Sequence, residues 1–166
     1  STGLSTGPHL HFEVRDTKTE KALDPYLYGI KPKDDLAPVL KSITIYALDS
    51  TSYNGSQKIK HHAVLKKSGE KYVPSFKEPL ELAGKIGLGI EIVDHMPGLP
   101  NKLGVASITL KLNNNIIYHF DITGFYFDET RFINSHLDYE ERARSGKIIQ
   151  KSFIDPGNKL SAYVEK

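Results

Sequence analysis

Two histidines close to the N-terminus, His9 and His11, are spaced so that they could carry out chemistry together. Glu13 continues the series two residues later. In a strand, side chains two residues apart point to the same face, and the rise places His9 and His11 roughly 6 to 7 Å apart. Imidazoles at this separation can converge on one metal ion or one substrate group. The spacing therefore indicates a metal or acid–base site, provided that other residues supply partners.

The residues between the histidines predict the element that positions them. Leu10, Phe12 and Val14 alternate with the polar residues, which is the pattern of a strand with one buried face. We therefore expect a β-strand here whose apolar side chains point into a core.

The same segment carries a recognisable motif. Residues 5–15 read Ser-Thr-Gly-Pro-His-Leu-His-Phe-Glu-Val-Arg, and residues 23–25 read Leu-Asp-Pro. The first run closely resembles the second signature of the lysostaphin-type (LytM) zinc metallopeptidases, and the second resembles the closing motif of that domain. The resemblance covers about residues 3 to 26. It implies that His11 is a zinc ligand and that His9 is the catalytic histidine.

The family resemblance also implies an activity and a location. LytM-type enzymes hydrolyse peptide cross-links of bacterial cell-wall peptidoglycan, so we expect peptidoglycan peptides as substrates and a place in the periplasm or cell envelope. Zinc would lower the pKa of its bound water to about 7 and polarise the scissile carbonyl. His9 would act as a base or as a hydrogen-bond donor in the transition state.

One part of the family pattern does not occur in these 166 residues. The other two zinc ligands of the family come from an upstream His-x-x-x-Asp, and none of the seven histidines is followed by Asp at that spacing. His9 and His136 are followed instead by Glu13 and Glu140. We therefore expect a fragment of a larger enzyme that is inactive alone. The alternative is a non-catalytic LytM-like protein whose β-domain binds a protein or the cell wall.

The composition of the chain argues against several other classes of protein and site. The chain has 39% hydrophobic and 25% charged residues, with a net charge of +2 and no cysteine. Basic residues are scattered, so we expect no nucleic-acid partner, and no apolar run reaches the ~18 residues of a membrane span. Without cysteine, neither disulfides nor Cys-ligated zinc can form.

The chain is predicted to divide near residues 31–38, where two prolines and four charges interrupt any periodic pattern. Residues 1–30 would be the last strands of a LytM-type peptidase domain. Residues 37–166 would be an accessory domain, an all-β immunoglobulin-like sandwich with one short helix. Its strands are expected over residues 39–48, 58–66, 71–74, 86–94, 105–112, 116–123, 148–154 and 160–164.

Turn and capping residues make this prediction more specific. Asn113, Asn114 and Asn115 favour a hairpin between two of the strands, because Asn tolerates positive φ. Ser135 is expected to cap a helix that ends at Gly146 and covers one end of the core, with its charged residues in solvent.

Three further groups of residues could form a site. His61 and His62 are adjacent in a strand, so their rings should point to opposite faces and share no metal. Asp94 and His95 form a loop that could bind a ligand, with an ordinary turn as the simpler interpretation. The aromatic residues could stack on sugars or, as is commoner, belong to the core; they are Phe125, Tyr126, Phe127 and Phe132.

Overall fold

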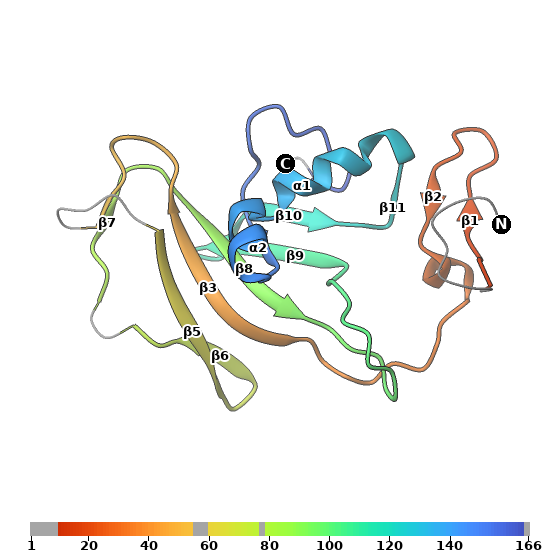
Figure 1. Ribbon diagram of the computed structural model, residues 1–166, viewed down its shortest axis with the longest axis horizontal. Coiled ribbons are helices and arrows are strands. Elements are labelled where there is room, and N and C mark those ends of the chain that lie inside the picture. The colour runs from red at the N-terminus through yellow and green to blue at the C-terminus, as the bar shows by residue number, and fades with distance from the viewer. Residues whose placement is uncertain (1–9, 55–59, 77–78, 165–166) are drawn as a thin grey trace.

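The computed structural model describes residues 10–54, 60–76 and 79–164. The predicted all-β character is confirmed, because most of the regular structure consists of antiparallel strands. The largest sheet has five strands in the order β12-β8-β3-β5-β6 and curves across the left half of Figure 1. Its strands are β3 (Val39–Ala47), β5 (Lys60–Ser68), β6 (Lys71–Pro74), β8 (Ile86–Val93) and β12 (Ile149–Lys151). These bounds lie close to the predicted ones, except that β12 is shorter.

A hairpin stands beside this sheet. It is formed by β9 (Ser107–Leu112) and β10 (Asn115–Asp121), and the chain reverses at Asn113 and Asn114, whose φ angles are 48° and 67°. The predicted Asn turn is therefore confirmed. Tyr118 of β10 donates a hydrogen bond from its hydroxyl to the carbonyl of Lys151 in β12, which ties the hairpin to the large sheet.

The main core cluster lies under this hairpin. Its buried members are Tyr118, Phe120, Leu160 and Ala162, with partly buried apolar residues packed around them. Residues 160–164 were expected to form a strand, and that prediction is wrong. The segment makes one isolated bridge, between Tyr163 and Phe120, because the chain turns back on itself with the Tyr163 amide bonded to the Leu160 carbonyl.

Short elements complete the fold. The helical ones are η1 (Pro25–Tyr28), η2 (Phe127–Phe132), α1 (Ile133–His136) and α2 (Tyr139–Ser145). The remaining strands are β1 (Val14–Arg15), β2 (Ala22–Leu23), β4 (Tyr53–Asn54), β7 (Leu82–Ala83) and β11 (Gly124–Phe125). In the described part of the chain, no helix has both the length and the apolar character to cross a membrane.

The predicted helix differs from the observed one at its beginning. Gly146 is its C-cap with φ 74°, as expected, but the chain is extended at Leu137 and α2 starts with Asp138 as N-cap. The Asp138 carboxylate accepts the Glu141 amide, whereas the Ser135 hydroxyl donates to the Phe132 carbonyl. Ser135 loses the cap because Asp138 is anchored by side chains of the sheet.

The position of α2 also corrects the prediction. The helix lies over a face of the five-stranded sheet, where Asp138 contacts Tyr46 of β3 and Lys60 of β5 (Figure 1). Asp138 and Glu141 are buried, so the helix does not present all its charges to solvent.

Strands β1 and β2 form an N-terminal hairpin, which is joined to the rest of the chain by the backbone pairing of β2 with β11. In the sheet β1-β2-β11, Leu23 pairs with Gly124 and Ala22 with Phe125. A Cβ atom on Gly124 would lie 2.6 Å from the Ala22 carbonyl oxygen, so only glycine permits this approach. The hairpin is at the right-hand end of Figure 1.

Candidate functional site

The two motif segments lie side by side in the structure. Strand β1, at the end of the first motif, pairs with β2, where Val14 faces Leu23 and Arg15 faces Ala22. The closing motif then caps η1, because the Asp24 carboxylate accepts the Tyr26 amide and Pro25 occupies the first turn.

The turn between the two strands is held by Asp16. Its carboxylate accepts hydrogen bonds from the amides of Lys18 and Thr19 and from the Thr19 hydroxyl, at 2.8 to 3.0 Å. The bonds from Thr19, with that from Lys18, lower the pKa of Asp16, so the group is ionised at neutral pH. This local network explains how a hairpin with so short a ladder keeps its shape.

His11 is open to solvent beside a carboxylate. Its side chain is 75% exposed, and Nε2 lies 3.7 Å from Oε2 of Glu13. The other oxygen of Glu13 accepts a 2.6 Å hydrogen bond from Nε of Arg15. That bond is the main reason why the pKa of Glu13 is lowered, with smaller contributions from His11. The arrangement is an accessible imidazole with an ionised acid at its side, which suits metal ligation or proton transfer.

His9 lies outside the described residues. That His9 and His11 share one face therefore stays a prediction.

The buried apolar face predicted beside His11 is not formed. Leu10 is 94% and Phe12 60% exposed, and the strand begins only at Val14. Alternation produces a buried face only where a second layer covers it, and in the described part of the chain no element packs on residues 10–13. The prediction of an inward-facing strand from Leu10 onward is wrong for this reason.

A zinc centre needs more ligands than the described residues bring together. A catalytic zinc takes three protein ligands and leaves a fourth position for water. Within the described part of the chain, no three His, Cys, Asp or Glu side chains are grouped to hold a metal. His11 is the one residue of this part that the family pattern assigns to zinc. The described residues therefore do not fit a zinc centre by themselves.

His136 and Glu140 are four residues apart, like His9 and Glu13, but their side chains lie in different environments. His136 is 1% exposed, and its ring is stacked on Phe120 with the ring centroids 4.3 Å apart. Glu140 is on the exposed side of α2 (85% exposed side chain). The pair is therefore not a joint site.

The other sequence candidates take up structural positions. His62 contacts the Thr44 hydroxyl at 3.2 Å and the Lys147 ammonium at 3.4 Å. Asp94 forms an isolated bridge with Leu103, and its carboxylate accepts the amide of His95, so the backbone here is that of a turn; the Asp94 residue also lines a cleft.

The aromatic residues are partly covered by the N-terminal hairpin. Phe125 and Phe127 meet edge to face at 5.5 Å. The Arg15 guanidinium lies 4.8 Å from the centroid of the Phe127 ring, and the Lys21 ammonium lies 5.3 Å from that of Tyr126. These cation–π contacts, together with the β2–β11 ladder, hold the hairpin on the body of the protein.

Two functional candidates were missed by the sequence analysis. His136 Nε2 and Gln150 Oε1 are buried and have no hydrogen-bond partner in the described part of the chain. Both residues line one cleft, together with Asp24, Asp34 and Asp94. No motif marks them, because they come from separate elements that meet only in the folded chain.

Comparisons of the chain with protein-family models, with curated proteins and with solved structures find no match.

Proposed function

We propose that residues 1–30 are the C-terminal part of a LytM-type zinc metallopeptidase domain that hydrolyses peptide cross-links of bacterial peptidoglycan. The observation that carries the proposal is the run of residues 5–15, followed by Leu-Asp-Pro at residues 23–25. The antiparallel pairing of Val14 with Leu23 supports it, because it brings the ends of the two motif segments into one hairpin.

In this proposal His11 is a zinc ligand and His9 is the catalytic histidine. The exposure of the His11 ring leaves it accessible to a metal held partly by other residues of the domain. Glu13 lies next to this ring and is itself oriented by Arg15, as the carboxylate partners of metal-bound histidines are. Such an enzyme would work in the periplasm or cell envelope.

Residues 37–166 are proposed to form an accessory domain with an immunoglobulin-like sandwich. The five-stranded antiparallel sheet and the β9–β10 hairpin beside it support this architecture. A protein or cell-wall partner would bind through this domain.

The most direct test is the gene sequence upstream of Ser1. The proposal requires a His-x-x-x-Asp in the preceding part of the peptidase domain. If that sequence encodes a related domain in which this motif is lost, the non-catalytic alternative is correct.

Two substitutions in the longest natural form of the protein test the residue roles. His11→Ala should lower zinc content and turnover together, because it removes a ligand. His9→Ala should leave zinc in place and slow turnover by about 10²-fold or more, the usual size for a general acid or base. Zinc is measured by atomic absorption and turnover on cross-linked muropeptides. If both variants keep zinc and full turnover, the assignment of this segment to an active site is wrong.

A further inference from the structure

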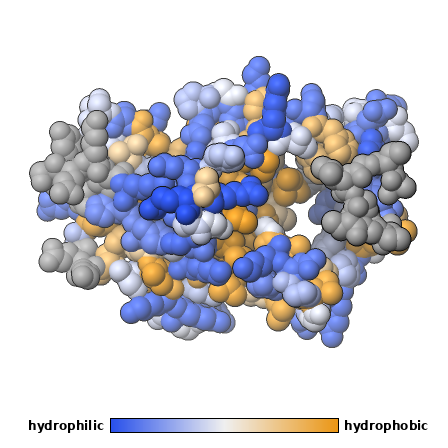
Figure 2. Space-filling model, viewed as in Figure 1, coloured by the Kyte–Doolittle hydropathy of each residue, from blue (hydrophilic) through white to orange (hydrophobic). Residues whose placement is uncertain are grey.

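A cleft of about 570 Å³ lies between the N-terminal segment, the β9–β10 hairpin and α1. Its volume is in the range of small-ligand sites. The surface in Figure 2 is hollowed between the N-terminal hairpin on the right and the rest of the molecule, and hydrophobic residues border the hollow. The cleft has apolar walls, to which Phe120, Ile122 and Ile133 belong.

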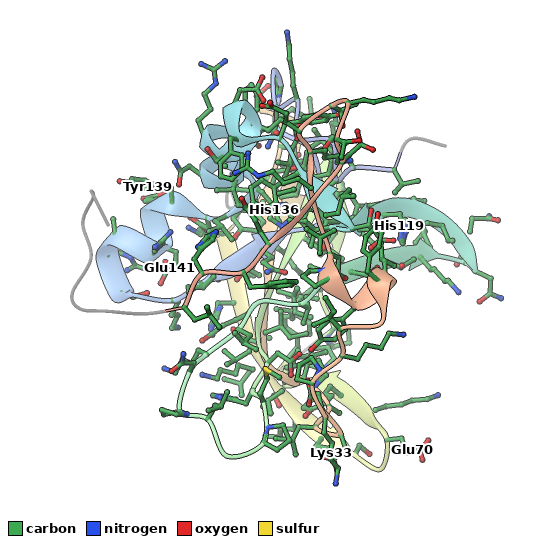
Figure 3. All side chains as sticks on the ribbon, turned by 90° about the vertical axis from the view of Figure 1, so that its right-hand side faces the viewer. Lys33, Glu70, His119, His136, Tyr139 and Glu141 are labelled. Carbon is green, nitrogen blue, oxygen red and sulfur yellow. The ribbon has the colours of Figure 1, made fainter. Side chains whose placement is uncertain are left out.

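Two buried polar groups in this cleft are left without partners. His136 is 1% and Gln150 8% exposed, yet Nε2 of the first and Oε1 of the second make no hydrogen bond to any described residue. Leaving a buried polar atom unpaired is costly, so such atoms usually mark the place of a water, an ion or a ligand. In the view of Figure 3, His136 is seen between α2, where Glu141 is labelled, and the β9–β10 hairpin, where His119 is labelled.

The partners of His136 indicate which hydrogen-bonding role is open. Nδ1 of His136 lies 3.3 Å from the Tyr163 hydroxyl. The oxygen of that hydroxyl accepts a 2.9 Å hydrogen bond from the side-chain amide of Asn158. Burial raises the pKa of Tyr163 to about 12, so the hydroxyl keeps a proton that it can donate to Nδ1. Burial also lowers the pKa of His136 to about 4, with a smaller effect of Lys151, so the ring is neutral. A neutral ring that accepts at Nδ1 carries its proton at Nε2.

The open groups are therefore a donor at His136 and an acceptor at Gln150. A hydroxyl or an amide can satisfy both, because each accepts and donates. A single water would also do so, but the cleft that the two residues line is far larger than one water needs.

The charge of the cleft selects among such ligands. Its lining includes the carboxylates of Asp24, Asp34 and Asp94 and no Lys or Arg. Each of these carboxylates accepts one backbone amide, and none has an ion-pair partner in the described part of the chain. A cationic group is therefore favoured near them and an anion is disfavoured.

We propose that this cleft binds a small amine-bearing amide, whose amide pairs with His136 and Gln150 and whose ammonium group lies among the three carboxylates. A free amino-acid amide and a lysine-like side chain of a peptide share this chemistry. The inference stands on the cleft alone and does not depend on the peptidase proposal.

The test uses the full 166-residue chain and a matched series of probes. These are 6-aminohexanamide, hexanamide without the amine, hexylamine without the amide, and adipamate with a carboxylate in place of the amine. Binding is followed by NMR through the side-chain carboxamide of Gln150 and the ring nitrogens of His136. We expect saturable shifts of both groups with 6-aminohexanamide, at least about 10-fold weaker affinity for hexanamide and hexylamine, and no binding of adipamate.

Variants separate binding from folding. Gly104→Leu places a side chain beside the Gln150 carboxamide, because a Cβ there would lie 3.4 Å from its Nε2, and it should abolish the shifts in a folded protein. Asp94→Asn keeps the oxygen that accepts the His95 amide and should weaken 6-aminohexanamide binding without affecting hexanamide. His136→Phe should also abolish binding, although this variant tests folding at the same time.

A capped tripeptide with a central lysine distinguishes the two sources of the ligand. Binding as strong as that of 6-aminohexanamide indicates a peptide, and binding of the small amide alone indicates a free metabolite. The proposal is overturned if no probe shifts Gln150 or His136 at about 20 mM, or if all four probes bind equally. It is also overturned if a long-lived water, seen by cross-relaxation, bridges the two groups and is not displaced.

Discussion

Lys60 of β5 and Asp138 at the N-cap of α2 are joined by an ion pair, with Nζ 2.8 Å from Oδ2. The same carboxylate accepts the Tyr46 hydroxyl at 2.7 Å and the Glu141 amide at 3.0 Å. Burial raises the pKa of Asp138, but the hydrogen bonds from Lys60, Glu141 and Tyr46 outweigh that effect and hold it below its ordinary value. One carboxylate thus both starts the helix and docks it on the sheet.

Asp138→Ala is expected to lower the free energy of unfolding by about 2 to 4 kcal/mol. It removes a helix cap worth about 1 kcal/mol and leaves the Tyr46 hydroxyl and the Lys60 ammonium without their carboxylate. Urea unfolding followed by circular dichroism measures the change. Glu140→Ala, at an exposed position of the same helix, is the control and should change stability by less than about 0.5 kcal/mol. Equal effects of the two substitutions would contradict the docking role.

His136 should make stability depend on pH. The pKa of His136 is lowered to about 4 in the folded chain and is near 6.5 in the unfolded chain. Between these two pH values the unfolded state binds a proton at His136 and the folded state does not. The contribution is complete above about pH 6.5 and is lost as pH falls toward 4, with a total of about 3 kcal/mol. Urea midpoints at pH 7.5 and 4.5 measure this, and His136→Phe should flatten the difference. His62→Asn, at an exposed position, should leave it unchanged; a flat profile in the unmodified protein would disprove the prediction.

Gly124→Val should loosen the N-terminal hairpin. The new side chain would collide with the Ala22 carbonyl, so β2 would have to leave β11. Amide hydrogen exchange at Ala22 and Leu23 should rise at least about 10-fold, while exchange in β3 stays the same. Thr123→Ala is the matched control, because its backbone carbonyl can still accept the Asp24 amide. Unchanged protection in the Gly124 variant would show that the ladder does not hold the hairpin.

The 166-residue chain should show no zinc-dependent peptidase activity. In the proposed assignment it offers one zinc ligand, His11, and the catalytic histidine, His9, which are too few to hold a tetrahedral centre with one open position. The chain is incubated with cross-linked muropeptides and added zinc, and the released amines are counted. Steady cleavage that a chelator stops would refute this expectation.

Local signals in the sequence were sufficient for several elements. The strand from Val39, the turn at Asn113 and Asn114, and the helix end at Gly146 are all found close to where they were predicted. Each depends on the backbone preferences of a few neighbouring residues, which any tertiary context must accommodate. The motif around His11 was equally readable, because it is contiguous.

The tertiary structure decided which side chains are buried and which hydrogen-bond partners they have. Ser42 and Thr44 of β3 are buried, and they bond to Glu91 of β8 and His62 of β5, which the register of the sheet places directly opposite them. Phe12 is exposed because nothing among the described residues covers it, although its alternation with polar residues resembles that of a buried strand.

The two candidate sites, the segment around His11 and the cleft lined by His136 and Gln150, differ in whether their residues are close together in the sequence. The LytM-like motif consists of residues near in sequence, so the resemblance could be recognised from the chain alone, whereas the pairing of Val14 with Leu23 is seen only in the structure. The cleft of His136 and Gln150 is assembled from segments that meet only when the hairpin docks on β11 and α1 packs on Phe120. Whether a buried polar atom finds a partner depends on every segment around it, and a sequence pattern carries information only about neighbours along the chain.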